Sequence, residues 1–503
     1  MSSDGERDET TLSVADTGLG SDAPAAPSRL ALVIAWCSGG PDRVGEVAII
    51  DPDETWILGR GEARPGGGER RMVFGRQRPS RDVATGSVDK WATGRPVDGK
   101  GISREQLRVR VRSGALEVTR IGRCPLSVRG AVVDQALVSP GDVLTLKGQL
   151  VLYCVRRPAA LPVLRLFPAS AVGPFGDADA HGMIGESPAA WALRERVAFC
   201  ARADAHVLLL GETGTGKELA ARALHALSPR AERPLCSRNA ATLPAGLVDA
   251  ELFGNVKNYP NPGMAERPGL IGQADHGTLF LDEIGELPHE LCSHLLRVVD
   301  EGGEYHRLGD SRPRRADVRL LAATNRDPRA LKHDLLARLT LRIELPSLDA
   351  RREDVPVLAR HLLLRAARRA PEIGQHFVEG WDGDGGEPRI DPRLMERLLA
   401  HRYAHNVREL DALLWRAMAG STGEVVELTD EVIAELGNTA TRRPAAATPG
   451  AAAGELSAQA LREAIDKHGG NLARAARALG LPSRYALYRL LKKHGLDPAK
   501  IRE

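Results

Sequence analysis

The chain has 503 residues, of which 43% are hydrophobic and 27% are charged, and its formal net charge is +3. This length exceeds one ordinary core and predicts three or so folded units joined by linkers. The six cysteines are scattered without a C-x-x-C pair, which argues against zinc sites and a disulfide framework. No apolar stretch approaches the roughly 20 residues that span a bilayer, and the polar, acidic N-terminus is unlike a signal peptide, so we expect a cytoplasmic protein without a membrane partner.

The first part of the chain divides into a polar segment and a series of short strands. Residues 1–28 contain almost no large apolar side chain, so we expect them to be disordered. Residues 29–158 carry short apolar or alternating runs, such as 47–50 and 107–111, separated by Gly, Pro and Asp. Strands at this spacing predict an antiparallel β-sandwich. Within it, the long Gly- and Arg-rich stretch 61–101 is expected to form a mobile loop.

The pattern then changes twice. After an expected linker over residues 159–180, strand and helix signals alternate over 181–345, which predicts a parallel sheet covered by helices on both faces. Residues 346–437 are helical and basic, and they predict a helical lid. Residues 438–455 lack core-forming side chains and predict a second linker of intermediate stiffness.

A glycine-rich loop follows the apolar run 206–210 and precedes a helical stretch. Its residues are Gly211, Glu212, Thr213, Gly214, Thr215, Gly216 and Lys217. The glycines let backbone N–H groups turn inward around phosphates, and Lys217 places a cation near the β and γ oxygens. The order of strand, loop and helix therefore predicts ATP binding.

The residue after the lysine is Glu218, where a Ser or Thr hydroxyl normally contacts Mg²⁺. Other oxygens must then hold the metal, and residues 277–283 suggest a buried strand that ends in two carboxylates. Asp282 suits Mg²⁺ coordination, and Glu283 is the candidate to orient or deprotonate the attacking water. The alternative is that the glycine-rich turn and the carboxylate pair are surface features, but their order on strands favours ATP and Mg²⁺ as ligands.

The end of the chain carries a pattern typical of DNA binding. Residues 456–503 hold ten Lys or Arg against four Asp or Glu. Asn471 can cap a helix over 472–479, Gly480 supplies a turn, and Ser483 can cap a second helix. This helix-turn-helix would place its second helix in the major groove of double-stranded DNA, and the alternative is a solvated helical hairpin. The candidate contact residues are Ser483, Arg484, Tyr485, Tyr488, Arg489 and Lys492.

Together these motifs resemble the bacterial enhancer-binding proteins, the AAA+ activators of sigma-54 RNA polymerase, with a Fis-like C-terminal helix-turn-helix. The resemblance covers about residues 184–496. It also includes the segments 184–188, 251–254, 322–325, 406–410 and 468–471. It implies a multidomain fold with a central α/β AAA+ P-loop domain, a helical lid and an all-α DNA-binding domain that follow the N-terminal sandwich. An upstream promoter element and the sigma-54 factor of RNA polymerase are the partners that it implies.

The same resemblance assigns roles to residues outside the phosphate-binding loop. Asn239 corresponds to the switch partner of Glu283, Thr324 and Asn325 correspond to sensors of the γ-phosphate, and Arg408 corresponds to the lid sensor. These assignments add four residues to the predicted ATP site.

Two further cations are implied to act between subunits. Arg338 corresponds to one of two arginines that reach the ATP of a neighbouring subunit, and the other position holds Lys332, which keeps the charge but loses the bidentate fork. An arginine supplied by the next subunit makes hydrolysis conditional on assembly. A homo-oligomer, from a dimer to a hexameric ring, is therefore implied.

The chain departs from this family in the loop that contacts the sigma factor. Family members that remodel sigma-54 carry a GAFTGA loop, and the matching positions here are Asn258, Tyr259, Pro260, Asn261, Pro262 and Gly263. The Phe and Thr that contact the sigma factor are missing, and two prolines stiffen the loop. His405 is a second departure, where Gly is usual. Two functions stay open: an ATP-dependent activator, or a DNA-binding repressor or adaptor whose nucleotide controls oligomerisation without sigma-54 remodelling.

The predicted sandwich resembles a forkhead-associated (FHA) domain through residues 58–60, 102–104 and 139–143. Such domains bind phosphothreonine, for which Arg60, Ser103 and Arg104 provide a cation, a hydroxyl and a second cation. The usual His shortly after Ser-Arg is replaced by Gln106. The resemblance implies a phosphothreonine protein or a Ser/Thr kinase as partner, and a nucleotide-dependent scaffold for such a kinase is a third open function. The alternative is that these side chains are only solvated.

Overall fold

The computed structural model describes residues 28–62, 69–77, 94–243, 247–300 and 302–440. The chain divides into two compact units, residues 1–440 and 441–503, and all described residues belong to the first. The predicted disordered segment up to residue 27, nearly all of the second linker and the predicted helix-turn-helix lie outside the described residues, whereas Ser28 begins strand β1. None of the described helices is both long enough and apolar enough to cross a bilayer.

The N-terminal β-domain, which we define as the described residues between 28 and 158, contains two sheets. Their strand orders are β2-β1-β11-β10-β7-β8 and β4-β3-β5-β6-β9. All pairings are antiparallel except β3 with β4. The bounds are β1 Ser28–Cys37, β2 Val47–Ile49, β3 Trp56–Leu58, β4 Arg70–Arg71, β5 Leu107–Arg112, β6 Ala115–Arg120, β7 Leu126–Val128, β8 Ala131–Val133, β9 Gln135–Val138, β10 Val143–Leu146 and β11 Leu150–Pro158.

The inner faces of the two sheets share one hydrophobic core. Leu32 and Leu152 of the first sheet pack in the same cluster as Leu107 and Leu116 of the second. Part of the stretch predicted as a mobile loop belongs to this core, because β4 pairs with β3 and the following Phe74 is fully buried. That prediction overlooked how strongly large apolar side chains such as Phe74 hold a backbone against a core.

Strands β1 and β11 are buried on both faces. Side chains of one parity enter the inner core, and those of the other parity pack with helices of the lid. The outward set consists of Ala31, Val33 and Ala35 of β1 and Val151, Tyr153 and Val155 of β11. An antiparallel sheet with one solvated face alternates apolar and polar residues, so the continuous apolar run in β1 matches a sheet that is covered on its outer face.

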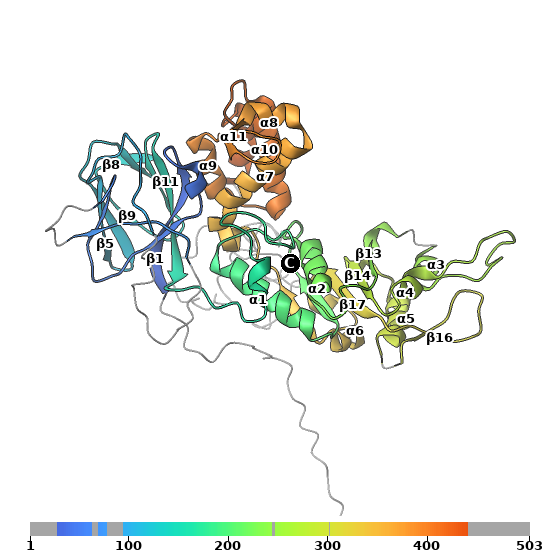
Figure 1. Cartoon of the computed structure of the whole chain (residues 1–503). Helices are drawn as coiled ribbons and strands as arrows, with labels where there is room; N and C mark the ends of the chain where they lie inside the picture. The colour runs from blue at the N-terminus through green and yellow to red at the C-terminus, as the bar shows by residue number, and fades with distance from the viewer. Residues whose placement is uncertain (1–27, 63–68, 78–93, 244–246, 301, 441–503) are drawn as a thin grey trace, which may run out of the picture. The chain divides into compact units, whose positions relative to one another are not determined.

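The central α/β domain has a five-stranded parallel sheet of order β13-β14-β17-β12-β18. Its elements are α1 Pro188–Arg202, β12 Val207–Leu210, α2 Lys217–Ala226, β13 Leu235–Asn239, α3 Val248–Phe253, α4 Gly269–Gln273, β14 Thr278–Asp282, α5 His289–Val299, β15 Glu304–Tyr305, β16 Arg314–Arg315, β17 Arg319–Thr324, α6 His333–Arg338 and β18 Leu341–Glu344. Val207 and Leu209 pack with α1 and α2, whereas Leu208 packs with α3 to α6. Figure 1 shows α1 and α2 on one side of β14 and β17, and α3 to α5 on the other. Helices therefore cover both faces, as the sequence predicted.

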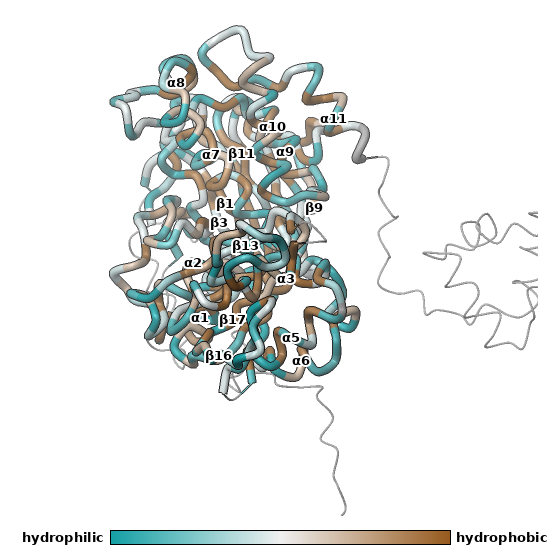
Figure 2. Tube along the Cα trace, turned by 90° about the vertical axis from the view of Figure 1, so that its right-hand side faces the viewer, coloured by the Kyte–Doolittle hydropathy of each residue, from teal (hydrophilic) through white to brown (hydrophobic). Residues whose placement is uncertain are grey.

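Local sequence explains where several helices begin. Ser187 caps α1 by accepting a hydrogen bond from the Ala190 N–H, and Pro188 occupies the first turn, where its missing N–H costs nothing. Asp391 caps α9 in the same way. In Figure 2 the hydrophobic parts of the trace gather in the interior, around strands such as β17, and the hydrophilic parts lie at outer loops.

The lid consists of helices that follow the turn Asp349–Asp354. Its elements are α7 Val355–Arg369, α8 Pro371–Phe377, β19 Val378–Glu379, β20 Glu387–Pro388, α9 Pro392–Ala400, α10 Asn406–Gly420 and α11 Asp430–Ala440. Leu358 and Leu362 of α7, Leu398 of α9 and Leu413 of α10 share one core with the outer face of β1 and β11. The β-domain and the lid are thus joined by a continuous hydrophobic cluster.

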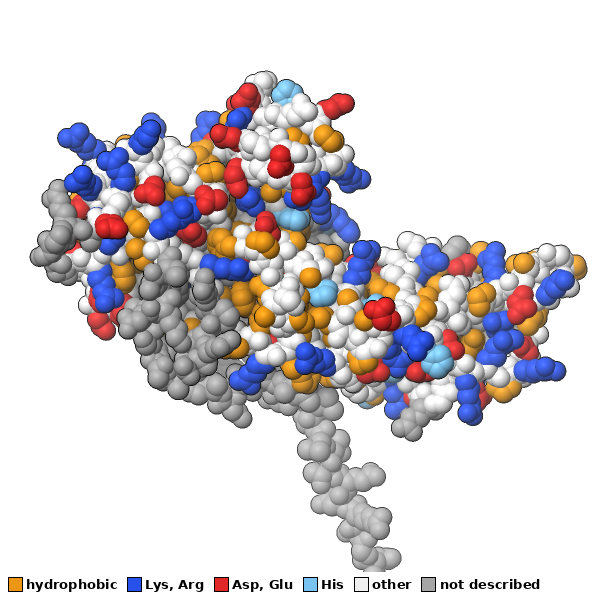
Figure 3. Space-filling model, viewed as in Figure 1, with side chains coloured by type: hydrophobic (Ala, Val, Ile, Leu, Met, Phe, Trp, Pro, Cys, Tyr) orange, Lys and Arg blue, Asp and Glu red, His pale blue; other side chains and the backbone are white. Residues whose placement is uncertain are grey.

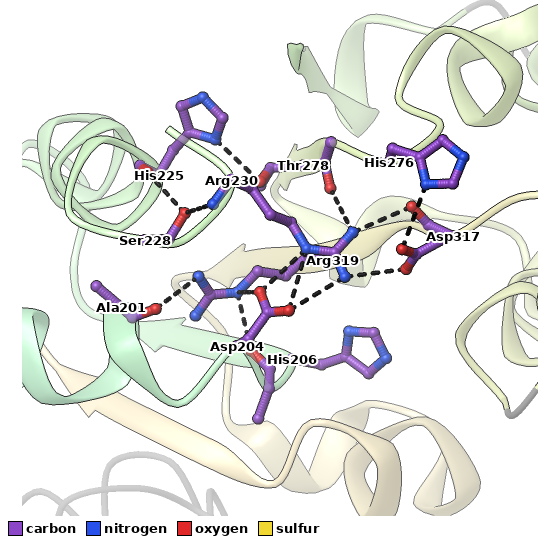
Figure 4. Close-up of polar contacts among 12 residues, drawn as sticks. Ala201, Asp204, His206, His225, Ser228, Arg230, His276, Thr278, Asp317 and Arg319 are labelled. Atoms are coloured by element: carbon purple, nitrogen blue, oxygen red, sulfur yellow. Dashed lines mark hydrogen bonds and ion pairs between the residues drawn. The ribbon is translucent and has the colours of Figure 1, made fainter. Parts of the chain in front are cut away.

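A charged network holds the sheet at the amino ends of its strands (Figure 4). The fully buried Arg319 at the start of β17 donates to the carbonyl oxygens of Cys200, Ala201 and Ala205 near the end of α1. Arg230 bridges the carboxylates of Asp204 and Asp317 nearby. Buried guanidinium groups are tolerated only when they are hydrogen-bonded in this way. The carboxyl ends of the same strands lie on the opposite side of the sheet.

Candidate nucleotide site

Three sequence motifs meet at the carboxyl edge of the parallel sheet. Strand register places Leu210 beside Thr324 and Asn239 beside Asp282. In the sheet, β12 is next to β17, and β14 follows on the other side of β17, so the loop after Leu210 and the carboxyl ends of β17 and β14 lie along the same side of the sheet. Ligands of open parallel sheets bind at this edge.

The phosphate-binding loop, residues 211–217, has the backbone that its glycines predict. Gly214 and Gly216 have φ values of 81° and 100°, in the left-handed region that favours glycine. A Cβ at Gly214 would also lie 2.1 Å from the carbonyl oxygen of His405 in the lid. Helix α2 starts at Lys217, directly after the loop, so its N-terminal N–H groups face the site.

Lys217 is a buried ammonium group without a close anion. Its side chain is 7% exposed, and Nζ donates to the carbonyl oxygens of Gly211 at 2.9 Å and Glu212 at 3.3 Å. The nearest carboxylate oxygen, Oε1 of Glu283, is 3.9 Å away. A buried charge that is satisfied only by neutral carbonyls suits an anionic ligand such as a phosphate group.

Asp282 and Glu283 lie at the end of β14. Glu283 has a left-handed φ of 51°, and its N–H donates to Oδ1 of Asp282 at 3.0 Å. Asp282 forms no ion pair within the described residues, so its carboxylate fits the oxygen chemistry that Mg²⁺ prefers. The resemblance pairs Asn239 with Glu283, but the Asn239 amide oxygen instead accepts a hydrogen bond from the Ala241 N–H at 2.9 Å.

The residues assigned as phosphate sensors contact the phosphate-binding loop. Thr324 is fully buried, and its carbonyl oxygen accepts a hydrogen bond from the Gly211 N–H at 3.3 Å. Nδ2 of Asn325 donates to Oγ1 of Thr213 at 3.3 Å. The strand β17 and the loop therefore support each other directly.

The lid reaches the same loop through the start of α10. Arg408 is exposed, and a Cβ built at Gly214 would lie 3.2 Å from the Arg408 Cβ. Asn406 was not predicted as a site residue, yet its Nδ2 donates to Oε2 of Glu212 and to the Thr213 carbonyl oxygen. The signal that could have found it is its type, because Asn tolerates the left-handed φ of 52° that this position adopts.

The two cations assigned to a neighbouring subunit's ATP lie on and before α6. Arg338 is 54% exposed and forms an ion pair with Asp300. Lys332 donates a hydrogen bond to Oγ of Ser293 on α5. Neither side chain contacts the phosphate-binding loop of its own subunit in the described part of the chain.

The loop at residues 258–263 closes on itself. The Asn258 side chain accepts a hydrogen bond from the Gly263 N–H at 2.9 Å, and the Asn258 N–H donates to the Met264 carbonyl oxygen at 2.9 Å. Tyr259 is 41% exposed, and its ring lies over Gly309. The loop therefore presents an aromatic side chain directly before two prolines, Pro260 and Pro262. Asn261 between them is exposed.

The predicted phosphopeptide residues lie at one end of the β-domain. The Arg60 N–H donates to the carbonyl oxygen of Ser103 at 3.0 Å, and Oγ of Ser103 accepts from the Arg123 N–H at 3.1 Å. Nη1 of Arg71 donates to the carbonyl oxygen of Arg104. The predicted DNA contacts, from Ser483 to Lys492, lie outside the described residues.

Comparisons with known proteins agree with this geometry. The phosphate-binding loop, the carboxylate pair and the helical lid define an AAA+ nucleotide-binding protein. Family models match as the Sigma-54 interaction domain over residues 183–348, the AAA+ ATPase lid domain over 349–448, and the bacterial regulatory protein, Fis family, over 453–494.

Curated relatives are similar over the same region. The transcriptional regulatory protein ZraR of Klebsiella oxytoca is 38% identical over 316 residues, which cover 61% of this chain and 68% of the relative. The formate hydrogenlyase transcriptional activator FhlA of Escherichia coli K12 is 37% identical over 337 residues, 65% of this chain and 46% of the relative. A crystal structure of NtrX from Brucella abortus in complex with ATP has 28% identity and a TM-score of 0.43, and covers 65% of this chain and 70% of that chain.

The chain belongs to the family of sigma-54-dependent transcriptional regulators. The matches confirm the predicted AAA+ domain with its lid and the Fis-type helix-turn-helix. They support transcription regulation, DNA binding, ATP binding and interaction with sigma-54 as the functions of the matched segments.

Proposed function

We propose that this regulator hydrolyses ATP as a homo-oligomer, transmits that hydrolysis to sigma-54 RNA polymerase bound at a promoter, and responds to phosphothreonine at its β-domain. The observation that carries the proposal is the buried Lys217, whose hydrogen bonds go only to carbonyl oxygens and whose ion pair with Glu283 is long, at 3.9 Å. A γ-phosphate bound beside these two side chains would be close to both a cation and a base.

Each residue then has a role in hydrolysis. Glu283 orients the attacking water and accepts its proton as the new P–O bond forms, and the bond from the γ-phosphorus to the bridging oxygen breaks to release ADP. Lys217 and the loop N–H groups compensate the charge on the phosphate oxygens. Asp282 is the residue that would hold Mg²⁺, which neutralises phosphate charge when bound.

The exposed Arg338 supports a role between subunits. A guanidinium on the surface can enter a neighbour's site without leaving a buried cavity, and its ion pair with Asp300 is exchangeable because exposed ion pairs contribute little. Lys332 would add a second positive charge to the same interface. A ring in which each site needs its neighbour's Arg338 would couple ATP hydrolysis to assembly.

The test of the ATPase proposal uses the whole chain and the substitution Glu283→Gln. We expect ATP to bind with nearly unchanged affinity, because the side chain keeps its size, while the hydrolysis rate falls by at least about 100-fold. Promoter activation with sigma-54 polymerase should be lost together with hydrolysis. Activation that is independent of ATP, or full hydrolysis by Glu283→Gln, would contradict the proposal.

The β-domain contributes an FHA-like phosphopeptide site in this proposal. Most of its arginines pair with a carboxylate, and basic and acidic side chains are interspersed on the face shown in Figure 3. Among the described residues, Arg60, Arg104 and Arg123 have no carboxylate within ion-pair distance. Ser103 precedes Arg104 in the chain and accepts hydrogen bonds from the backbone N–H groups of Arg60 and Arg123. Three unpaired arginines beside one hydroxyl suit a dianionic phosphate.

Gln106 supports this site from beneath. It is fully buried, its Oε1 accepts hydrogen bonds from the N–H groups of Ser103 and Cys124, and its Nε2 donates to the Cys124 carbonyl oxygen. The residue that departs from the FHA pattern therefore still joins both loops of the proposed site. Phosphothreonine peptides should bind at least about tenfold more tightly than their unphosphorylated forms, and Arg60→Ala should remove that difference. Equal binding of both peptides would refute the site.

A second function is favoured by the closed loop at residues 258–263. If its hydrogen bond from Gly263 to Asn258 persists through the ATP cycle, the loop does not remodel sigma-54, and the protein is a DNA-binding repressor or adaptor. Glu283→Gln separates the two functions. It should abolish activation under the first, whereas DNA occupancy and repression should survive under the second.

A further inference from the structure

We propose that Asn406 is a positioning residue that holds the phosphate-binding loop in the conformation that receives ATP, and that it thereby ties the lid to nucleotide binding. The inference rests on the ATP site proposed above. Asn406 lies at the start of α10 and is fully buried, although Arg402 and Arg408, within four residues of it in the chain, are exposed.

The Asn406 side chain joins three parts of the molecule. Its Nδ2 donates to Oε2 of Glu212 at 3.0 Å and to the carbonyl oxygen of Thr213 at 3.1 Å. Its Oδ1 accepts a hydrogen bond from the Leu348 N–H at 2.6 Å, at the junction between the α/β domain and the lid. Both polar atoms of this buried amide are therefore hydrogen-bonded, and together they link the lid, the domain junction and the phosphate-binding loop.

The backbone of a phosphate-binding loop explains why such a residue is needed. N–H groups that turn inward toward phosphates leave the carbonyl oxygens of the same peptides on the outside. Partly buried carbonyl oxygens also need donors, and here Asn406 Nδ2 donates to the Thr213 carbonyl oxygen while the Val407 N–H donates to that of Gly214 at 3.2 Å. The lid thus supplies the donors that keep the inner surface of the loop free for the ligand.

The backbone of Asn406 fits this role as well. Its φ is 52°, a left-handed value that Asn adopts more readily than most residues. The residue before it, His405, places its carbonyl oxygen against Gly214 so closely that only glycine fits there. The backbone of the lid therefore contacts the backbone of the loop directly, and the Asn406 amide fixes the position of one relative to the other.

The test compares two substitutions of Asn406 in the full chain. Asn406→Gly keeps the left-handed backbone at little cost and removes the amide, and Asn406→Asp keeps the size but turns a donor into a carboxylate that faces Glu212. We expect both to weaken the Kd of a fluorescent ATP analogue by about tenfold or more. Gln375→Ala, which removes an exposed amide from α8 of the same lid, should leave the Kd unchanged.

A rescue experiment separates positioning from a purely structural role. The double variant Asn406→Asp with Glu212→Gln restores an amide opposite a carboxylate with the two groups exchanged, so part of the lost affinity should return. A structural role alone would lower the melting temperature but leave the Kd of the folded variants and their response to Glu212→Gln unchanged. Wild-type protein that binds no ATP would contradict the proposed site itself, whereas wild-type binding with unchanged Asn406 variants would overturn only this inference.

Discussion

Lys217 is the residue whose environment depends most on a ligand. Its ammonium group is buried, and its partners are two carbonyl oxygens of the loop. Replacing it by Ala should abolish the stabilisation that ATP gives to the folded chain, which amounts to roughly 2.7 kcal/mol for a ligand at 100 times its Kd. Thermal unfolding with and without ATP measures this difference. Lys147→Ala, an exposed lysine of the β-domain, should keep the full ATP response, and a Lys217→Ala protein that is still stabilised would contradict the assignment.

Arg338 makes a prediction that only an oligomer can satisfy. Arg338→Ala should reduce ATP hydrolysis by at least about 100-fold, and so should Glu283→Gln, yet each variant supplies what the other lacks. Mixing the two inactive proteins should restore measurable ATPase activity if Arg338 acts on a neighbour's site. Arg329→Ala removes a nearby exposed arginine and should have little effect. Mixtures that stay inactive would place Arg338 outside the site.

The site residues differ in how far the sequence could reveal them. Lys217, Asp282 and Glu283 could be predicted as site residues because local spacing carries their chemistry: a loop after a strand, and carboxylates at a strand end. Asn406 could not be found in this way, since its partner Glu212 is far away in the chain and the contact exists only once the lid folds back. Nothing in a local pattern distinguishes an Asn that caps a helix from one that holds a distant loop.

At the scale of elements, the loop at residues 258–263 differs in sequence from the GAFTGA loop of the family, and its Tyr259 ring packs against Gly309. A Cβ at Gly309, whose φ is 77°, would lie 2.6 Å from the Tyr259 ring. Gly309→Ala should therefore displace the loop, and it should weaken ATP-dependent capture of sigma-54 without changing ATP affinity. Tyr259→Ala should weaken capture by at least about tenfold through the loss of its exposed ring.

Capture of purified sigma-54 in the presence of a transition-state analogue of ATP hydrolysis is the measurement for both variants. Asn261→Ala changes an exposed residue of the same loop and serves as the matched control. Undiminished capture by Tyr259→Ala would show that the loop is not the contact surface. Absence of capture by the wild type would favour the repressor or adaptor.

Elements were predicted well where a single period dominates and poorly where a distant partner decides. The alternation of strands and helices in the α/β domain follows from sequence, because the central strands β12, β14 and β17 are buried on both faces by the helices around them. Strand β1 shows the same continuous apolar pattern, but the sequence did not indicate that the lid covers its outer face. Met72 and Phe74 likewise hold a stretch that its Gly and Arg content assigned to a loop.

At the scale of the molecule, the β-domain and the lid are built around one core. Val33 on the outer face of β1 packs with lid residues, and Nε1 of Trp36 donates to the carbonyl oxygen of Ile390 at 2.7 Å. Oγ1 of Thr145 donates to Oε1 of Glu396 on α9 at 2.6 Å. Because the same lid contacts the phosphate-binding loop through α10, a packed, continuous path joins the β-domain to the predicted nucleotide site.

A charge on the outer face of β1 tests this coupling. Val33→Asp buries an unpaired carboxylate. It should lower the free energy of unfolding by several kcal/mol, and it should shift the unfolding of the β-domain and of the lid together. Two probes, one in each part, should report one transition in the wild type. Val132→Asp, at a β8 position that is 78% exposed, is the control. Separate transitions in the wild type would contradict a shared core.

The burial of Glu353 beside Arg157 predicts that the stability of the molecule depends on pH. The two side chains are nearly buried and lie 3.3 Å apart between Nε and Oε2, and neither of these atoms has a hydrogen-bond partner. Burial raises the pKa of Glu353 to about 7, Arg157 opposes this shift, and Asp354 adds to it. Since the ordinary value is 4.5, the folded chain holds this proton more tightly than the unfolded chain does.

The resulting stability is fully present below about pH 4.5 and is lost as the pH rises through about 7. Glu353→Gln mimics the protonated carboxyl and should flatten this dependence, by about 3 kcal/mol at most between the two limits. Denaturant unfolding of the wild type and the variant between about pH 5 and pH 8 measures the difference. Glu372→Gln, an exposed carboxylate of α8, should follow the wild-type curve. If Glu353→Gln follows it too, the junction of the β-domain and the lid does not titrate in this range, and Glu353 is held ionised by Arg157.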